Sequence, residues 1–157
     1  MEEQLVVFEL NDEAYGVNVA YVQSIIPMQD IVTVPGAPVF IEGVVNLRGA
    51  VVPVIDLRVR FGLLEETGAE GALTGRPKAV IVIVEFNKLQ VGLIVDKVTE
   101  VIKIPDTAIE PPSPLLASVD TAYLRGIGKL GDDRVIILLD LARVFSWEEQ
   151  QALVQAA

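Results

Sequence analysis

The apolar residues of this chain occur in short runs separated by polar, turn-forming residues. Most of the runs are rich in Val and Ile, which favour extended strands because they fit a pleated, half-buried surface. Two pairs of runs are joined by Asn-containing turns, Leu5–Leu10 with Tyr15–Val19 and Ala79–Phe86 with Val91–Val95. Each pair predicts an antiparallel hairpin.

A different spacing follows each predicted hairpin. Apolar residues then recur at i, i+3, i+6 and i+7, in Val19, Val22, Ile25 and Ile26 and again in Val95, Val98, Val101 and Ile102. This spacing predicts a short helical segment in both places. Pro27 and Pro105 limit its length, because proline lacks the amide proton and clashes with the preceding turn.

The chain contains an internal repeat. Gly16 and Gly92 lie 76 positions apart within matching sequence, and Asp56 and Asp140 lie 84 positions apart. Each copy ends in a further predicted hairpin, Val44–Leu47 with Val51–Leu57 in the first and Ile127–Leu130 with Val135–Leu141 in the second. Several matches in the same order indicate a tandem duplication.

The repeat predicts an all-β protein made of two small five-stranded barrels, with short helical segments. We expect the first barrel over residues 5–62 and the second over residues 79–145, with the possibility that strands are exchanged between them. The Gly- and Glu-rich residues 63–78 read as a flexible linker. Residues 146–157 predict a C-terminal helix, with Ser146 and Glu149 as a capping box and with Trp147 and Leu153 docking it.

The amino-acid composition excludes several classes of catalytic and metal-binding site. The 157 residues include no Cys and no His, which excludes disulfides, Cys/His zinc sites, cysteine nucleophiles and Ser-His-Asp triads. The formal net charge of −10 disfavours binding to nucleic acid or to anionic lipid headgroups. The acidic N-terminus lacks the features of a signal peptide, and no apolar run is long enough to cross a bilayer, so a cytoplasmic protein is expected.

The remaining catalytic candidates are carboxylates. Asp56 and Asp140 occupy equivalent places at the ends of apolar strands, and as a pair they could carry out acid–base chemistry. The favoured interpretation is that each accepts backbone hydrogen bonds in its own copy. Asp132 and Asp133 fail the pattern of a calcium loop and are better read as a turn between strands. We therefore expect no enzyme, no cofactor and no metal site.

A binding surface is a stronger candidate. A pseudo-twofold arrangement of the copies would bring the segments after Gly16 and Gly92 together, so that Val19, Val22, Ile25 and Val98 line an apolar groove for an amphipathic helix. Pattern alone favours plain core for these residues. Arg48, next to Gly49 at a predicted hairpin tip, could pair with a partner's carboxylate or be an ordinary solvated charge.

Several motifs together resemble the CheW family of bacterial chemotaxis coupling proteins. They are Glu13-Ala14-Tyr15-Gly16-Val17, Val22-Gln23, residues 38–49 (PVFIEGVVNLRG), residues 51–57 (VVPVIDL), residues 91–96 (VGLIVD) and Tyr123-Leu124-Arg125-Gly126. The most specific part is Asn-Leu-Arg-Gly followed by Val-Pro-Val-Ile-Asp-Leu. The similarity extends over roughly residues 5–145.

The resemblance implies two SH3-like barrels in a non-enzymatic adaptor that couples transmembrane chemoreceptors to the histidine kinase CheA. The implied partners are the regulatory domain of a CheA-type kinase and the cytoplasmic hairpin tip of the receptors, and the protein is expected to associate with membrane-anchored receptor arrays. Val19, Val22, Ile25, Val98 and Arg48 then fall at the family's receptor-binding groove. No residues are assigned to the kinase surface.

Three other readings stay open at this stage. The chain could be a CheW-like adaptor of a non-chemotaxis pathway, such as surface motility or second-messenger control. It could be a piece of a kinase's own regulatory domain, although Met1 and a capped terminal helix favour a complete protein. It could also be an enzyme or a barrel that binds a small ligand.

Overall fold

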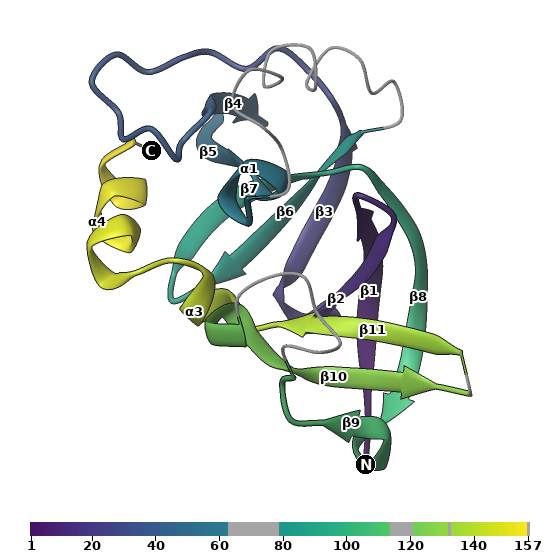
Figure 1. The fold of residues 1–157 in the computed structure, drawn as a ribbon. Helices are drawn as coiled ribbons and strands as arrows, with labels where there is room; N and C mark the ends of the chain where they lie inside the picture. The colour runs from purple at the N-terminus through teal and green to yellow at the C-terminus, as the bar shows by residue number, and fades with distance from the viewer. Residues whose placement is uncertain (63–78, 114–120, 132, 157) are drawn as a thin grey trace.

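Two curled β-sheets make up most of the molecule (Figure 1). The computed structural model describes residues 1–62, 79–113, 121–131 and 133–156. One sheet has the strand order β8 (Lys97–Pro105), β1 (Glu2–Leu10), β2 (Glu13–Asn18), β11 (Arg134–Leu139), β10 (Leu124–Leu130) and β9 (Ile109–Glu110). The other has the order β3 (Val22–Pro27), β6 (Val80–Phe86), β7 (Leu89–Val95), β5 (Ala50–Asp56) and β4 (Gly43–Leu47). The all-β prediction is confirmed.

Each sheet takes strands from both copies of the repeat. The first hairpin, β1–β2, joins the six-stranded sheet with the last four strands of the chain, and the hairpin β6–β7 joins the five-stranded sheet with β3, β4 and β5. The predicted division into residues 5–62 and 79–145 thus describes two sequence copies that exchange hairpins in the fold. The predicted linker 63–78 lies outside the described residues.

Parallel pairing joins the exchanged hairpin to its host strands in both sheets. Strand β2 lies parallel to β11, with Gly16 opposite Leu138, and β7 lies parallel to β5, with Gly92 opposite Val54. A Cβ atom on Gly16 would lie 3.1 Å from Ile136 Cγ2, and one on Gly92 would lie 2.8 Å from Ile81 Cγ2. At the repeated glycine, the neighbouring side chains inside each barrel pack so closely against the backbone that a Cβ atom would be crowded.

Of the helical segments predicted after the first hairpin of each copy, only a short turn at the start of the first one forms, and the rest of both segments is strand. Val19–Tyr21 form a single 3-10 turn (η1), residues 22–27 form strand β3, and the second copy continues directly into strand β8. Both strands contain a β-bulge, at Gln23 in the pairing of β3 with β6 and at Thr99 in the pairing of β8 with β1. Because a bulge inserts one residue into the alternation, residues three apart face the same side. The bulges therefore account for the helix-like spacing of Val22 and Ile25 and of Val98 and Val101.

Three apolar cores result from this arrangement. Each barrel has a small one of its own, centred on Ile81, Ile83 and Ile94 in one and on Leu5, Val7 and Ile136 in the other. The largest core lies between the sheets and draws residues from β1, β2, β5, β6, β7, β10 and β11, from the helices that follow β5 and β11, and from the C-terminal helix. The two sheets are therefore joined by a continuous apolar interior.

Short helices close the ends of the sheets. Helix α1 (Leu57–Arg60) follows β5, α3 (Leu141–Val144) follows β11, and α4 (Trp147–Ala156) ends the described chain. The predicted capping box is confirmed, since Ser146 Oγ accepts from the Glu149 amide at 3.1 Å and a Glu149 carboxylate oxygen accepts from the Ser146 amide at 2.8 Å. Leu153 is buried in the central core as expected, and the side chain of Trp147 lies outside the described part.

Candidate protein-binding surface and a carboxylate pocket

Strands β3 and β8 are repeat-related edge strands, one in each sheet. Their bulges turn Val22 and Ile25 to one face of β3, and Val98 and Val101 to the matching face of β8. Val22 and Val98 are partly buried and pack against the core between the sheets. Ile25 and Val101 are exposed at 43% and 54% of their surface. Each edge therefore presents one anchored and one exposed apolar side chain.

Three of the predicted groove residues lie on these edges, two on the five-stranded sheet and one on the six-stranded sheet. Val22, Ile25 and Val98 lie on the two bulged edges, and Val19, on the 3-10 turn just before β3, is partly buried. Val101 was not among the predicted site residues, although its spacing from Val98 repeats that of Ile25 from Val22. The repeat itself was the signal that could have found it.

Arg48 lies elsewhere, at the tip of the β4–β5 hairpin. Arg48 and Gly49 both have positive φ angles, 53° and 87°, in a two-residue turn whose Gly49 amide donates to Asn46 Oδ1 at 2.9 Å. Strand β4 forms the edge of the five-stranded sheet opposite β3. Arg48 is exposed, and among the described residues its side chain has no ion pair. The arginine is thus presented to solvent by a turn of fixed geometry.

Asp56 and Asp140 each cap a short helix, which confirms the structural interpretation of both. Asp56 accepts from the Arg58 amide at 2.9 Å, and Asp140 accepts from the Ala142 amide at 3.1 Å. Each carboxylate serves the helix that follows its own strand. The two do not form a pair for acid–base chemistry.

Asp56 also holds the one fully buried arginine among the described residues. The Arg58 side chain donates through Nε and Nη2 to both oxygens of Asp56, at 3.0 and 2.7 Å, and its Nη1 lies 3.1 Å from Asp96 Oδ1. Burial alone would lower the pKa of Arg58, but hydrogen bonds and charge from Asp56 and Asp96 outweigh it and raise the pKa. The guanidinium stays charged and links α1 to the start of β8.

Asp96 extends this network to the exchanged hairpin. Its second carboxylate oxygen accepts from the amide of Asn11, in the β1–β2 turn, at 2.8 Å. The chain passes from the five-stranded to the six-stranded sheet at Asp96. One buried guanidinium and its two carboxylates therefore fix the point where the sheets meet.

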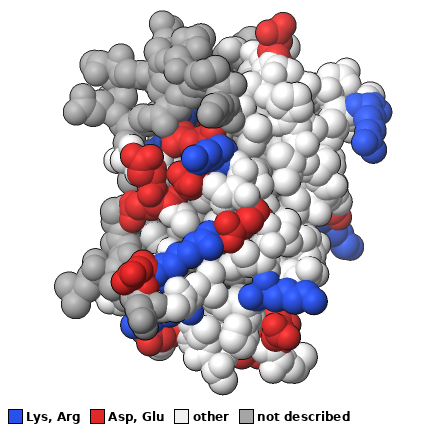
Figure 2. All heavy atoms as spheres, turned by 90° about the vertical axis from the view of Figure 1, so that its right-hand side faces the viewer, with Lys and Arg blue, Asp and Glu red and all other residues white. Residues whose placement is uncertain are grey.

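On the face shown in Figure 2, acidic side chains gather at the left, and acidic and basic side chains lie next to each other in the lower part. Exposed ion pairs on the six-stranded sheet include Arg134 with Glu100 at 2.8 Å and Lys129 with Glu110 at 3.1 Å. The hydrogen bond from Arg134 lowers the pKa of Glu100. A wide area to the right of this view carries few charges.

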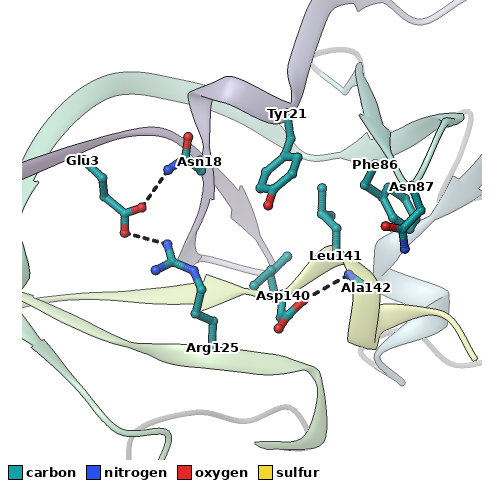
Figure 3. Close-up of a pocket in the computed structure, with 10 residues that line it drawn as sticks. Glu3, Asn18, Tyr21, Phe86, Asn87, Arg125, Asp140, Leu141 and Ala142 are labelled. Carbon is teal, nitrogen blue, oxygen red and sulfur yellow. Dashed lines mark hydrogen bonds and ion pairs between the residues drawn. The ribbon is translucent and has the colours of Figure 1, made fainter.

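A pocket of about 320 Å³ opens beside the end of β11 (Figure 3). Its charged lining residues are Glu3, Arg125 and Asp140, and Arg125 Nη2 lies 2.7 Å from Glu3 Oε1. The other lining residues are Asn18, Tyr21, Phe86, Asn87, Leu139, Leu141 and Ala142. Within the described ranges there is no group of His, Cys, Asp or Glu side chains placed to hold a metal ion.

The fold and these surfaces define a duplicated, strand-exchanged β-barrel protein with exposed edges suited to protein contacts. Residues 4–149 match the model of the CheW-like domain, and the chain belongs to the CheW-like family. It is similar to the chemotaxis protein CheW of Treponema pallidum, at 36% identity over 96% of this chain and 86% of that one, and to that of Klebsiella aerogenes, at 34% identity over 94% and 84%.

A solved structure agrees with this assignment. The scaffolding protein TtCheW of Thermoanaerobacter tengcongensis superposes with a TM-score of 0.78 at 41% identity, covering 93% of this chain and 89% of that one. The prediction of two SH3-like barrels and that of a CheW scaffold in chemotaxis signalling are both confirmed. No helix in the described ranges is both long and apolar enough to span a membrane.

Proposed function

We propose that this chemotaxis scaffold couples chemoreceptors to a CheA-type histidine kinase without catalysing a reaction. Its membership of the CheW-like family carries the proposal, together with relatives named as chemotaxis proteins. One surface would hold the cytoplasmic hairpin tip of a receptor and another the kinase's regulatory domain. Such a bridge raises the effective concentration of each partner near the other. It would act at receptor arrays in the cytoplasm.

We assign the receptor surface to the bulged edges of β3 and β8. Val22 and Val98 are anchored in the central core, which fixes the position of both edges, and Ile25 offers exposed apolar area to a helix. Val19 precedes β3, and Val101 completes the pattern on β8. Arg48 would supply a separate charged contact, because its hairpin tip lies on the opposite edge of the five-stranded sheet.

Pull-down with a receptor cytoplasmic fragment tests the apolar surface. We expect Ile25→Asp to weaken receptor capture about tenfold or more, since a buried unpaired carboxylate costs more than the lost apolar contact. Val39→Asp is the matched control, because Val39 is almost fully exposed and lies in the connection before β4. Equal capture by native and Ile25→Asp protein would rule out the assignment of β3.

Charge reversal tests the hairpin tip. Arg48→Glu is compared with Lys88→Glu, because Lys88 also lies at a two-residue hairpin tip with a positive φ angle, 64°. We expect Arg48→Glu, and not Lys88→Glu, to weaken co-purification with receptor or kinase. Co-purification of native protein with neither partner would argue against the proposed coupling itself.

A further inference from the structure

The buried Arg58 site and its counterpart in the second copy differ at two positions, because Arg58 corresponds to Ala142 and Asp96 corresponds to Ala20. Asp56 follows β5 and Asp140 follows β11, and each caps a short helix in the same way. Two residues beyond Asp56 stands Arg58, whose side chain is fully buried against that carboxylate. Two residues beyond Asp140 stands Ala142. The second copy keeps the capping carboxylate, Asp140, and has neither the guanidinium nor the second carboxylate of the Arg58 site.

The pocket beside β11 is the repeat-related counterpart of the Arg58 site. Asp140 and Ala142 line it, in the places of Asp56 and Arg58. Asn87 also lines it, and this residue occupies the same place in the β6–β7 turn as Asn11 does in the β1–β2 turn. In the first copy, that surrounding space is filled by an arginine side chain of the chain itself. In the second copy it is a hollow of about 320 Å³.

The walls of the pocket suit a cation. Of the two carboxylates that line it, Glu3 is already engaged by Arg125 at 2.7 Å, so Asp140 is the one left to bind a further cation. The second oxygen of Glu3 accepts from Asn18 Nδ2 at 2.7 Å. Asp140 Oδ1 accepts a hydrogen bond from the Ala142 amide at 3.1 Å, and Oδ2 lies 3.4 Å from Nε of the exposed Arg143. The Asp140 side chain is 31% exposed. Its carboxylate thus keeps lone pairs for a further donor.

An aromatic ring faces the same space. Figure 3 shows Tyr21 extending toward the pocket from the 3-10 turn after β2, on the side opposite Asp140. A planar guanidinium can donate two parallel hydrogen bonds to a carboxylate while stacking on an aromatic face. An ammonium group matches this arrangement less well, because it is a compact point charge.

We propose that this pocket receives an arginine side chain from a partner protein. The guanidinium lies on Asp140 and against Tyr21, in the position that Arg58 fills in the other half of the molecule. The pocket adjoins the start of β3, because Tyr21 shares its 3-10 turn with Val19, but none of the apolar residues assigned to the receptor surface lines it. The proposal does not rest on which partner brings the arginine.

The first test is an NMR titration of the full chain with N-acetyl-arginine-methylamide at low salt. We expect saturable shifts of the Tyr21, Asp140 and Ala142 amides with a dissociation constant on the order of 1 mM. The lysine analogue should bind several-fold more weakly. Asp140→Asn keeps an N-cap residue, because asparagine caps a helix as well as aspartate does, and it should weaken arginine binding about tenfold.

The second test fills the pocket from within. Ala142→Arg places an arginine where the repeat has Arg58, so we expect a higher melting temperature and loss of arginine binding, whereas Ala142→Met should leave the melting temperature close to native. Equal shifts with the lysine analogue, unchanged binding by Asp140→Asn, or shifts confined to other surfaces would overturn the proposal. Receptor and kinase co-purification is measured separately, so its failure is distinguishable from a failure of this site.

Discussion

Arg58 and Asp96 lie far apart in the sequence, yet their charged groups approach to 3.1 Å at the junction of the two sheets. Arg58 belongs to the first copy of the repeat and Asp96 to the second. With Asp56, they form a buried network in which one guanidinium meets two carboxylates. The contact ties the helix after β5 to the residue that precedes β8, an edge strand of the other sheet.

Removing Arg58 should therefore destabilise the whole molecule. We expect Arg58→Ala to lower the free energy of unfolding by about 3–5 kcal/mol, because two carboxylates lose their cation in a buried setting. The measurement is urea unfolding followed by circular dichroism. Arg143→Ala is the control, since Arg143 pairs with Asp140 at 3.4 Å on an exposed surface and should change stability by less than about 1 kcal/mol. Similar effects of the two variants would contradict the network's role.

The repeated glycines should be sensitive to a single methyl group. We expect Gly92→Ala to cost about 1–3 kcal/mol, because its Cβ would lie 2.8 Å from Ile81 Cγ2 and 3.3 Å from Val54 Cγ2. Gly16→Ala should cost less, because its closest contact would be 3.1 Å. Thermal unfolding of both variants compares the two losses of stability. A smaller loss for Gly92→Ala than for Gly16→Ala would show that the five-stranded sheet relaxes more easily than its packing indicates.

Glu42 should make stability depend on pH. Burial raises the pKa of its carboxyl above the ordinary value of 4.5, the Asp56 carboxylate raises it further, and Arg58 opposes the shift. The folded chain thus holds this proton more tightly than the unfolded chain does. The contribution of Glu42 is favourable below pH 4.5 and is lost as the pH rises through its folded pKa.

The Glu42→Gln variant tests this sign. We expect its melting temperature to exceed the native one at pH 7 and to match it at about pH 4, where the native carboxyl is protonated. Glu2→Gln removes a charge from an exposed residue and serves as the control. A melting temperature lowered by Glu42→Gln at pH 7 would mean that attraction to Arg58 dominates at this position.

The terminal helix should depend on its capping box. We expect Ser146→Ala to reduce the free energy of unfolding by about 1 kcal/mol, because the Glu149 amide loses its acceptor. Ser146→Asp keeps an acceptor at the cap and should stay close to native. Amide hydrogen exchange over residues 147–153 localises the effect, and equal exchange in all three proteins would show that packing alone holds the helix.

Much of the fold could be predicted because local chemistry determines it. The Asn11 and Asn87 turns, the Arg48-Gly49 turn and the Ser146 cap each depend on a few neighbouring residues. The bulged strands could not be predicted, because a bulge and a helical turn both place apolar residues three positions apart on one face, as with Val22 and Ile25. Only the pairing partner distinguishes them, and β3 pairs with a strand from the other copy.

The candidate sites also contain features that local sequence predicts and features that it does not. Asp56 and Asp140 were recognised as caps from their places at strand ends. The burial of Arg58 could not be predicted, because its second partner, Asp96, comes from the other half of the chain. The pocket beside β11 could not be predicted, because the role of Ala142 depends on the burial of Arg58 at the equivalent position of the first copy.

The exchange of hairpins sets the order in which the molecule can be completed. Strands β1 and β2 are synthesised well before β8 and β11, with which they pair. The six-stranded sheet has to wait for almost the whole chain, and contacts so distant in sequence form slowly. A chain synthesised only to its midpoint would expose the apolar faces of the β1–β2 and β4–β5 hairpins, and neither sheet could be completed until strands of the second copy had been made.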